Sequence, residues 1–269
     1  MRRSFIIGAM IAVTLAAGPA RAAGPEASPI AGDWTVTVGV LGGFLPEYVG
    51  SDRYEALPWP IFNVRRAGTP WRFTTIRDGF GIAIVDTGQF RFGPVGRLIL
   101  PRDQDDSPAL RGLGNVDWAI EIGAFAEFWA FPWLRTRAEV RQGFGGHDGI
   151  VSIISADLVM RTTETLTLSA GPRLTLATAD ALQPYFGVTP AQSVTSGLPV
   201  YSPGGGVRSY GFGAQAHKQW TREWATRVFV EYERLADEVA NSPVLFRGGS
   251  PDQVMVGAGV SYSFDISLP

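Results

Sequence analysis

The sequence predicts an all-β fold, a single closed antiparallel transmembrane β-barrel of about 12 strands. In the stretch 253–264 apolar residues occupy one parity: Val254, Val256, Ala258, Val260, Tyr262 and Phe264. A strand of this kind is apolar on one face only. Because the chain offers no helix-period segment to cover the other face, a barrel with lipid outside and water inside is favoured over a soluble sandwich.

Composition agrees with this fold class. Glycine is abundant at 33 residues, aromatic residues reach 12%, and the mean hydropathy is only +0.08. No apolar run approaches the length of a transmembrane helix, whereas the alternation of a barrel strand averages to a hydropathy near zero. We expect the aromatic pair Tyr262 and Phe264 at a membrane interface, with outer-membrane lipid and lipopolysaccharide around the barrel.

The beginning of the chain predicts a secretory signal peptide. Arg2 and Arg3 precede an apolar run at 5–17, and Ala20-Arg21-Ala22 fits the small-x-small rule, with cleavage after Ala22. The expected organisation is a signal peptide at 1–22, a linker at 23–32, the barrel at 33–264 and a C-terminal extension at 265–269.

Charge and cysteine content restrict the partners and the compartment. Removal of Arg2, Arg3 and Arg21 leaves 20 basic against 25 acidic residues, a formal charge of −5, which argues against a nucleic-acid partner. The chain has no cysteine. An exported protein of this size without disulfides fits the Gram-negative cell envelope, and we expect it in the outer membrane.

Twelve strands follow from the alternation. They are expected at 34–40, 57–65, 71–77, 80–85, 90–100, 117–128, 134–141, 150–161, 166–176, 210–217, 226–233 and 254–264. The second is a poor strand because it carries Pro58 and Pro60, and Asp78-Gly79 predicts a tight turn. Pro94 and Pro172 each remove a ladder donor in a barrel without free edges, so we expect local bulges there.

Connection lengths predict the orientation. The connections after the second, fourth, sixth, eighth and tenth strands are short, whereas those after the first, fifth, ninth and eleventh are long. Outer-membrane barrels place short turns in the periplasm and long loops outside. The short turns at Asp78-Gly79 and at 143–149 are then expected on the outside as small exceptions.

Charged residues share one parity on the predicted sixth, seventh and eleventh strands. These inward residues are Glu121, Glu127, Arg135, Arg137, Glu139, Arg141, Arg227, Glu231 and Glu233. Such a face must meet water or other charges, because desolvating unpaired charges is costly. Four arginines nearly balance five glutamates, so we expect a plug of paired charges, whereas a selective pore presents a surplus of one sign.

No catalytic residue, cofactor or metal site is predicted, and the chain is not expected to be an enzyme. Its two histidines, His147 and His217, have no metal-ligand partner at a recognisable spacing. A lipid-deacylating hydrolase would need Ser209 or Ser169 to face His217 across the barrel, and no local motif supports this arrangement.

Blocks of sequence along essentially the whole mature chain resemble one family. The blocks are Pro46-Glu47-Tyr48-Val49-Gly50-Ser51-Asp52, Gly112-Leu113-Gly114-Asn115-Val116-Asp117, Tyr185-Phe186-Gly187-Val188-Thr189, Ser196-Gly197-Leu198-Pro199-Val200-Tyr201, Tyr232-Glu233-Arg234-Leu235 and Asn241-Ser242-Pro243. In order and spacing they resemble the MltA-interacting protein (MipA) / OmpV family of outer-membrane proteins. The resemblance implies an outer-membrane barrel. For the founding member it implies a scaffold that joins a lytic murein transglycosylase to a bifunctional penicillin-binding protein.

Three functions are compatible with these observations. The favoured one is a structural scaffold for cell-wall remodelling enzymes, with a lytic transglycosylase and a penicillin-binding protein as partners. The charged inward face supports the alternative of a narrow porin-like channel for small solutes. The third is an outer-membrane lipid-modifying hydrolase.

Overall fold

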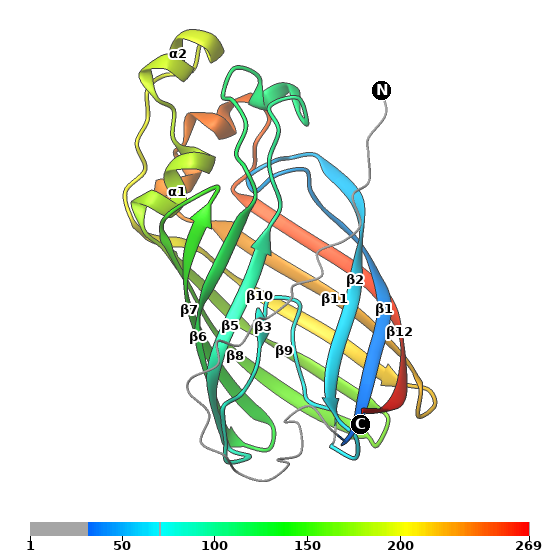
Figure 1. The fold of residues 1–269 in the computed structure, drawn as a ribbon. Helices are drawn as coiled ribbons and strands as arrows, with labels where there is room; N and C mark the ends of the chain where they lie inside the picture. Colours follow the sequence, from blue (N-terminus) through cyan, green and yellow to red (C-terminus); the bar gives the residue numbers. More distant parts are fainter. Residues whose placement is uncertain (1–31, 70, 269) are drawn as a thin grey trace.

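The computed structural model describes residues 32–69 and 71–268. The predicted signal peptide, its cleavage after Ala22 and the linker up to residue 31 lie outside these residues. The described chain is a twelve-stranded antiparallel sheet that curls into a barrel (Figure 1). Its strands are β1 (Gly32–Pro46), β2 (Tyr54–Arg66), β3 (Phe80–Gly81), β4 (Val85–Asp86), β5 (Phe90–Ile99), β6 (Ala119–Phe131), β7 (Leu134–Gly145), β8 (Ile150–Thr163), β9 (Leu166–Ala177), β10 (Gly206–Gln219), β11 (Trp224–Leu235) and β12 (Asp252–Leu268).

The strand order confirms the predicted all-β antiparallel architecture. Neighbours follow β2-β1-β12-β11-β10-β9-β8-β7-β6-β5-β3, and β4 also pairs with β5. The first and last strands of the chain therefore lie side by side, in a register that runs from Gly32 opposite Leu268 to Phe44 opposite Val256. Strands that follow one another in sequence pair around the rest of the wall, joined by short turns at one end.

The outer face of the wall is apolar. Along β12, residues of one parity are each close to 40% exposed: Val254, Val256, Val260, Tyr262 and Phe264. A surface of this extent is stable against lipid, because contiguous apolar patches are rare on proteins that face water. No helix in the described ranges is long and apolar enough to cross a membrane, a finding that does not bear on strands crossing as a barrel.

The wall extends past Phe264, which corrects the predicted C-terminal extension. β12 continues to Leu268, and residues 265–268 pair with the first residues of β1. The Thr35 hydroxyl also donates a hydrogen bond of 2.6 Å to Asp265 Oδ1. Continued pairing satisfies the backbone of both strands, so these residues belong to the barrel.

Residues 71–79, here called the inserted segment, do not form the predicted third wall strand. The Gln215 side chain on β10 donates to Thr74 O at 2.8 Å, and Gly79 N donates to Glu139 on β7 at 3.0 Å. Contacts with strands on different walls place the segment inside the barrel.

Two further expectations change with the inserted segment. The turn at Asp78-Gly79 lies in the lumen and not on the outer surface. The strand expected at 80–85 is present as the two short strands β3 and β4, both paired with β5. The alternation that predicted a wall strand is real, but it buries Phe73 and Thr75 inside the molecule.

The sheet has two ends among the described residues, β2 and the β3–β4 arm, and they do not pair with each other. We call the line between these two unpaired ends the seam. Ala67 N donates to Asp33 O at 3.0 Å, so odd residues of β2 point their backbone groups toward β1. Pro58 and Pro60 are even, and their nitrogens, which carry no hydrogen, lie at the free edge. The prolines thus mark β2 as an edge strand.

The bulges expected at Pro94 and Pro172 are absent. Pro94 O accepts from Ile82 N at 3.1 Å, so Pro94 faces the β3–β4 arm, where the pairing is already interrupted. The β8–β9 ladder skips the two pairs around Pro172 and keeps its register on both sides. A missing donor therefore interrupts a ladder here without shifting it.

The long connections fold into a cap over one end of the barrel (Figure 1). They contain η1 (Pro108–Leu110), α1 (Ala179–Phe186), α2 (Pro190–Ser196), α3 (Asp237–Ala240) and η2 (Pro243–Arg247). The cap has its own apolar core, which includes Leu110, Leu182, Val188, Val239 and Val244. By the rule for outer-membrane barrels this end is external and the end with short turns is periplasmic.

A buried arginine holds two parts of the cap together. Arg102 Nη1 donates to Tyr185 O at 2.6 Å, and its guanidinium lies 5.7 Å from the centre of the Tyr185 ring. Burial raises the pKa of the Tyr185 hydroxyl and lowers the pKa of Arg102. The folded cap therefore favours the neutral phenol.

Candidate functional site

The inner face of β6 and β7 is a ladder of opposite charges. The two-residue period of a strand points these side chains into the lumen: Glu121, Glu127, Arg135, Arg137, Glu139 and Arg141. All six are buried. The register places Glu127 opposite Arg137 and Trp129 opposite Arg135, so carboxylates and guanidiniums meet across the strand pair.

Arg135 is the most enclosed of these residues, with 0% of its surface exposed. Its Nη2 lies 2.6 Å from Asp78 Oδ2 and 2.8 Å from Glu127 Oε2, and its Nη1 lies 3.2 Å from Asp157 Oδ2. Asp78 belongs to the inserted segment and Asp157 to β8. One guanidinium therefore joins three parts of the chain.

A second group of charges lies nearer the cap. Arg141 Nε is 2.8 Å from Glu121 Oε2, and the same arginine pairs with Glu139. His147 Nε2 is 3.2 Å from the other Glu121 oxygen. Arg137 Nη2 lies 2.8 Å from Glu139 Oε1 and connects this group with the charges around Arg135.

The network continues onto the opposite wall through the inserted segment. Arg77 Nη2 is 2.6 Å from Glu233 Oε2, and Arg77 Nε is 3.4 Å from Glu231 Oε2. Arg173 on β9 is 2.7 Å from Asp157 Oδ1 and 3.8 Å from Glu231 Oε2. Ion pairs thus extend from β6 to β11 across the lumen.

Arg227 differs from the other eight predicted lumen residues, which are all ion-paired. Its Nη2 donates to Thr74 Oγ1 at 3.2 Å, and within the described ranges no carboxylate oxygen lies within 4.0 Å of it. Arg97, also inward, donates to the Arg77 carbonyl. The lumen therefore carries two arginines that are hydrogen-bonded to neutral acceptors and have no ion-pair partner among the described residues.

Sequence reasoning missed several members of this network. Asp157 and Arg173 occupy the inward parity of β8 and β9, so extending the parity argument to those strands would have found them. Arg77 and Asp78 gave no such signal, because their segment was assigned to the wall.

The aromatic residues predicted for an interface lie on the outer face of β12. The Tyr262 and Phe264 rings stack at 6.2 Å between centroids, and Trp224 lies 5.0 Å from Tyr262. They are near the periplasmic end, since Tyr262 pairs with Val38 close to the start of β1.

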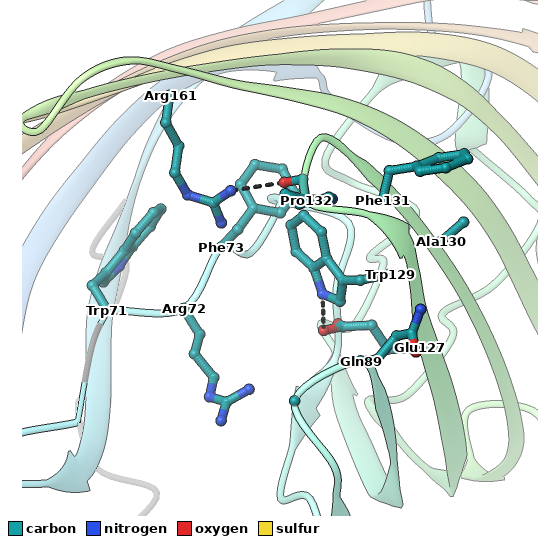
Figure 2. A pocket seen from close by; sticks show the side chains of 11 residues that line it. Trp71, Arg72, Phe73, Gln89, Glu127, Trp129, Ala130, Phe131, Pro132 and Arg161 are labelled. Atoms are coloured by element: carbon teal, nitrogen blue, oxygen red, sulfur yellow. Dashed lines mark hydrogen bonds between the residues drawn. The ribbon is translucent and has the colours of Figure 1, made fainter.

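A pocket of about 420 Å³ opens at the periplasmic end beside the inserted segment (Figure 2). The residues that matter for its chemistry are Trp71, Arg72, Phe73, Gln89, Trp129 and Arg161. They come from the inserted segment, the turn before β5, and the periplasmic ends of β6 and β8.

The indoles of this pocket are held in place. Trp71 stacks on the His217 ring, with 4.1 Å between centroids and 5° between planes. Trp129 Nε1 donates to Glu127 Oε1 at 3.1 Å, and Phe73 meets the Trp129 ring edge-on at 6.2 Å. The pocket therefore presents two fixed aromatic surfaces.

No catalytic arrangement forms from the serines considered for a hydrolase. Ser209 and His217 are eight residues apart on β10, roughly 26 Å along a strand, and Ser209 Oγ donates to Glu233. Ser169 is registered with Gln215, and His217 stacks on Trp71. Within the described ranges, no three His, Asp or Glu side chains form a group able to hold a metal ion.

The curled antiparallel sheet, its apolar outer face and its charged interior define an outer-membrane type of β-barrel. The family described as MltA-interacting protein MipA matches residues 38–264. The chain belongs to this family and is an outer-membrane β-barrel. No curated protein matches the sequence.

Solved structures resemble the fold at low identity. The NanC porin is 11% identical, with 84% of this chain and 98% of that chain covered and a TM-score of 0.42. An outer membrane channel from Pseudomonas putida F1 is 9% identical, covering 91% and 100%, with a TM-score of 0.39. The CymD monoaromatic hydrocarbon channel is 9% identical, covering 88% and 89%, with a TM-score of 0.40.

Proposed function

We propose that this barrel is a structural scaffold that holds peptidoglycan-remodelling enzymes at the periplasmic face of the outer membrane, and that its lumen does not conduct. The observation that carries the proposal is the inserted segment, which Arg77 and Asp78 bind to both walls by ion pairs with the buried residues Glu233 and Arg135. A segment fixed in this way occupies the path that a solute would take. A barrel whose lumen is occupied acts through the surfaces it presents.

The periplasmic end supplies a surface for partners. Phe131 and Trp133 stack on each other in the β6–β7 turn, and both are about half exposed. Aromatic residues of this kind are enriched at protein interfaces and at membrane interfaces. The family's name specifies interaction with MltA, so a lytic transglycosylase is the first partner that we propose, with a penicillin-binding protein as the second.

Two measurements test the scaffold. The purified barrel in a planar bilayer is expected to show almost no conductance. It is also expected to retain a lytic transglycosylase on an affinity column, and Phe131→Ala combined with Trp133→Ala is expected to weaken retention. Exposed Val194 of the cap, changed to Ala, serves as the control at the opposite end. A stable conductance together with no retention would contradict the proposal.

A narrow channel is the second candidate, favoured by one observation. Arg97 and Arg227 carry lumen charge without a carboxylate partner among the described residues, and a surplus of positive charge attracts anions. An anion-selective conductance that falls in Arg227→Gln would support this function.

A further inference from the structure

The periplasmic pocket lies at the open end of the lumen, below the charge network. Figure 2 shows Trp71 and Trp129 on two sides of it, with Arg161 above and Arg72 below in that view. Its volume of about 420 Å³ is at the small end of ligand pockets. It has room for a short, flat segment of a ligand and not for a folded domain.

The aromatic surfaces favour a ligand with flat apolar faces. The stacked His217 ring fixes Trp71, and the Glu127 hydrogen bond fixes Trp129, so neither indole loses much freedom when a ligand binds. The faces of aromatic rings are electronegative and attract the weakly positive C–H groups of a neighbouring molecule. Pyranose rings present such C–H groups on their faces and hydroxyl or amide groups around their edges.

The polar groups favour a ligand that carries negative charge. Arg161 Nη1 donates to Pro132 O at 2.8 Å, and Arg72 Nη2 lies 2.7 Å from Asp86. Each guanidinium has five N–H donors, so both retain donors for a ligand. The lining carboxylate, Glu127, is buried and is already bound by Trp129 and by arginines of the network. Guanidinium groups bind carboxylates in a planar, two-bond geometry.

We propose that this pocket binds the glycan of peptidoglycan, an amino-sugar chain with carboxylate-bearing substituents. Its ring faces lie against Trp71 and Trp129, and a carboxylate meets Arg161 or Arg72. This deepens the proposed function and rests on it, because the glycan is the material that the scaffolded enzymes remodel.

Lipid headgroups fit the pocket less well. Lipopolysaccharide belongs to the outer leaflet, at the end covered by the cap. Phospholipid headgroups such as glycerol phosphate supply an anion but no sugar ring, so they add no stacking contact with Trp71 or Trp129. The combination of two fixed indoles and two guanidiniums matches a carboxylated sugar.

Calorimetry on the purified full-length barrel in detergent tests the proposal with three probes. These are the disaccharide-peptide released from peptidoglycan by a muramidase, the neutral N-acetylated form of chitobiose, and glycerol phosphate. The disaccharide-peptide is expected to bind about tenfold more tightly than chitobiose, since only it offers a carboxylate to the arginines. Glycerol phosphate is expected not to compete. Absence of binding of the disaccharide-peptide at millimolar concentration overturns the proposal, and so does equal competition by glycerol phosphate.

Matched variants separate the two kinds of contact. Arg161→Gln is expected to remove the preference for the carboxylated sugar. Trp71→Ala is expected to lower the affinity for both sugars by about tenfold. Trp71→Phe keeps a ring and is expected to retain most of the affinity, so it replaces Trp71→Ala if that variant does not fold. Trp220→Ala and Arg222→Gln, in the exposed β10–β11 turn, are the controls. Equal weakening by the controls overturns the proposal.

The scaffold and the pocket can fail independently. Retention of a transglycosylase is measured with peptidoglycan digested away, and binding of the disaccharide-peptide is measured without any enzyme. If transglycosylase retention is lost and sugar binding is intact, only the scaffold proposal is refuted. If sugar binding is lost and retention is intact, only the pocket proposal is refuted.

Discussion

Replacement of Arg135 by methionine tests whether the buried ion pairs stabilise the barrel. Methionine fills a similar length without charge, and Arg135 is fully buried between Asp78, Glu127 and Asp157. Removing one partner of a buried pair costs about 3–5 kcal/mol, because the remaining charge is left uncompensated. Asp157 keeps Arg173 and Glu127 keeps Arg137. Asp78 keeps only a longer contact of 3.9 Å with Arg137 Nε, so we expect the loss for one pair and not a threefold sum.

The assay is reversible urea unfolding in lipid vesicles, which gives the free energy of unfolding. The folded fraction is measured from the heat-dependent shift of the folded band on a gel. Arg222→Met, in an exposed turn, is the control and is expected to change the unfolding free energy by less than about 0.5 kcal/mol. Adding Asp78→Asn to Arg135→Met is expected to restore part of the loss. If the free energy of unfolding of Arg135→Met lies within about 0.5 kcal/mol of that of the natural protein, the ion pairs of Arg135 do not stabilise the fold.

Three further predictions concern the wall, the orientation and the cap. Val228→Arg places a charge on the lipid face near the bilayer centre and is expected to cost about 2–4 kcal/mol in the same assay, whereas Val228→Leu is expected to fold normally. A peptide tag inserted beside Gly197 is expected to bind antibody on intact cells, and labelling only after the outer membrane is permeabilised would reverse the orientation. Burial raises the pKa of the Tyr185 hydroxyl, so its contribution to stability is full below about pH 10 and is lost as pH rises through the raised pKa. Protease cleavage of the cap is therefore expected to increase above that pH, and a cleavage rate that stays constant to pH 12 would contradict this role of Tyr185.

The wall was largely predictable because its physical signal is local. Each strand has lipid on one side and the lumen on the other, so a two-residue period appears wherever the chain is in the wall. The clearest strands, β6, β7 and β12, show it along most of their length. Glu121, Glu127 and Arg137 lie on the buried parity of β6 and β7 for the same reason.

The inserted segment was not predictable from this signal. Trp71, Phe73 and Thr75 alternate with their neighbours as in a wall strand, and a strand-like segment inside a lumen also has two different faces. Only the partners distinguish the two locations, and those partners, such as Glu139 and Gln215, are distant in sequence. The segment also changes the charge balance, because Arg77 and Asp78 enter the lumen with it.

The prolines indicate positions where strand pairing is interrupted, whereas the sequence alone predicted bulges at Pro94 and Pro172. Pro58 and Pro60 weakened the second predicted strand, and Pro94 and Pro172 were expected to force bulges because a closed barrel has no edge. The seam provides the edge. Pro58, Pro60 and Pro94 are accommodated where pairing is absent or short, and Pro172 is accommodated by two missing ladder pairs.

The seam affects what determines the circumference of the barrel. Where every strand is paired, strand number and register fix the circumference. Across the seam no backbone ladder among the described residues does so. The walls are instead linked inside the lumen by two adjacent residues of opposite charge. Asp78 binds Arg135 on β7 and Arg77 binds Glu233 on β11. The inserted segment therefore connects two opposite walls through the lumen. The diameter of this barrel is therefore set partly by electrostatics, and it responds to changes in charge that would leave a fully hydrogen-bonded cylinder unchanged.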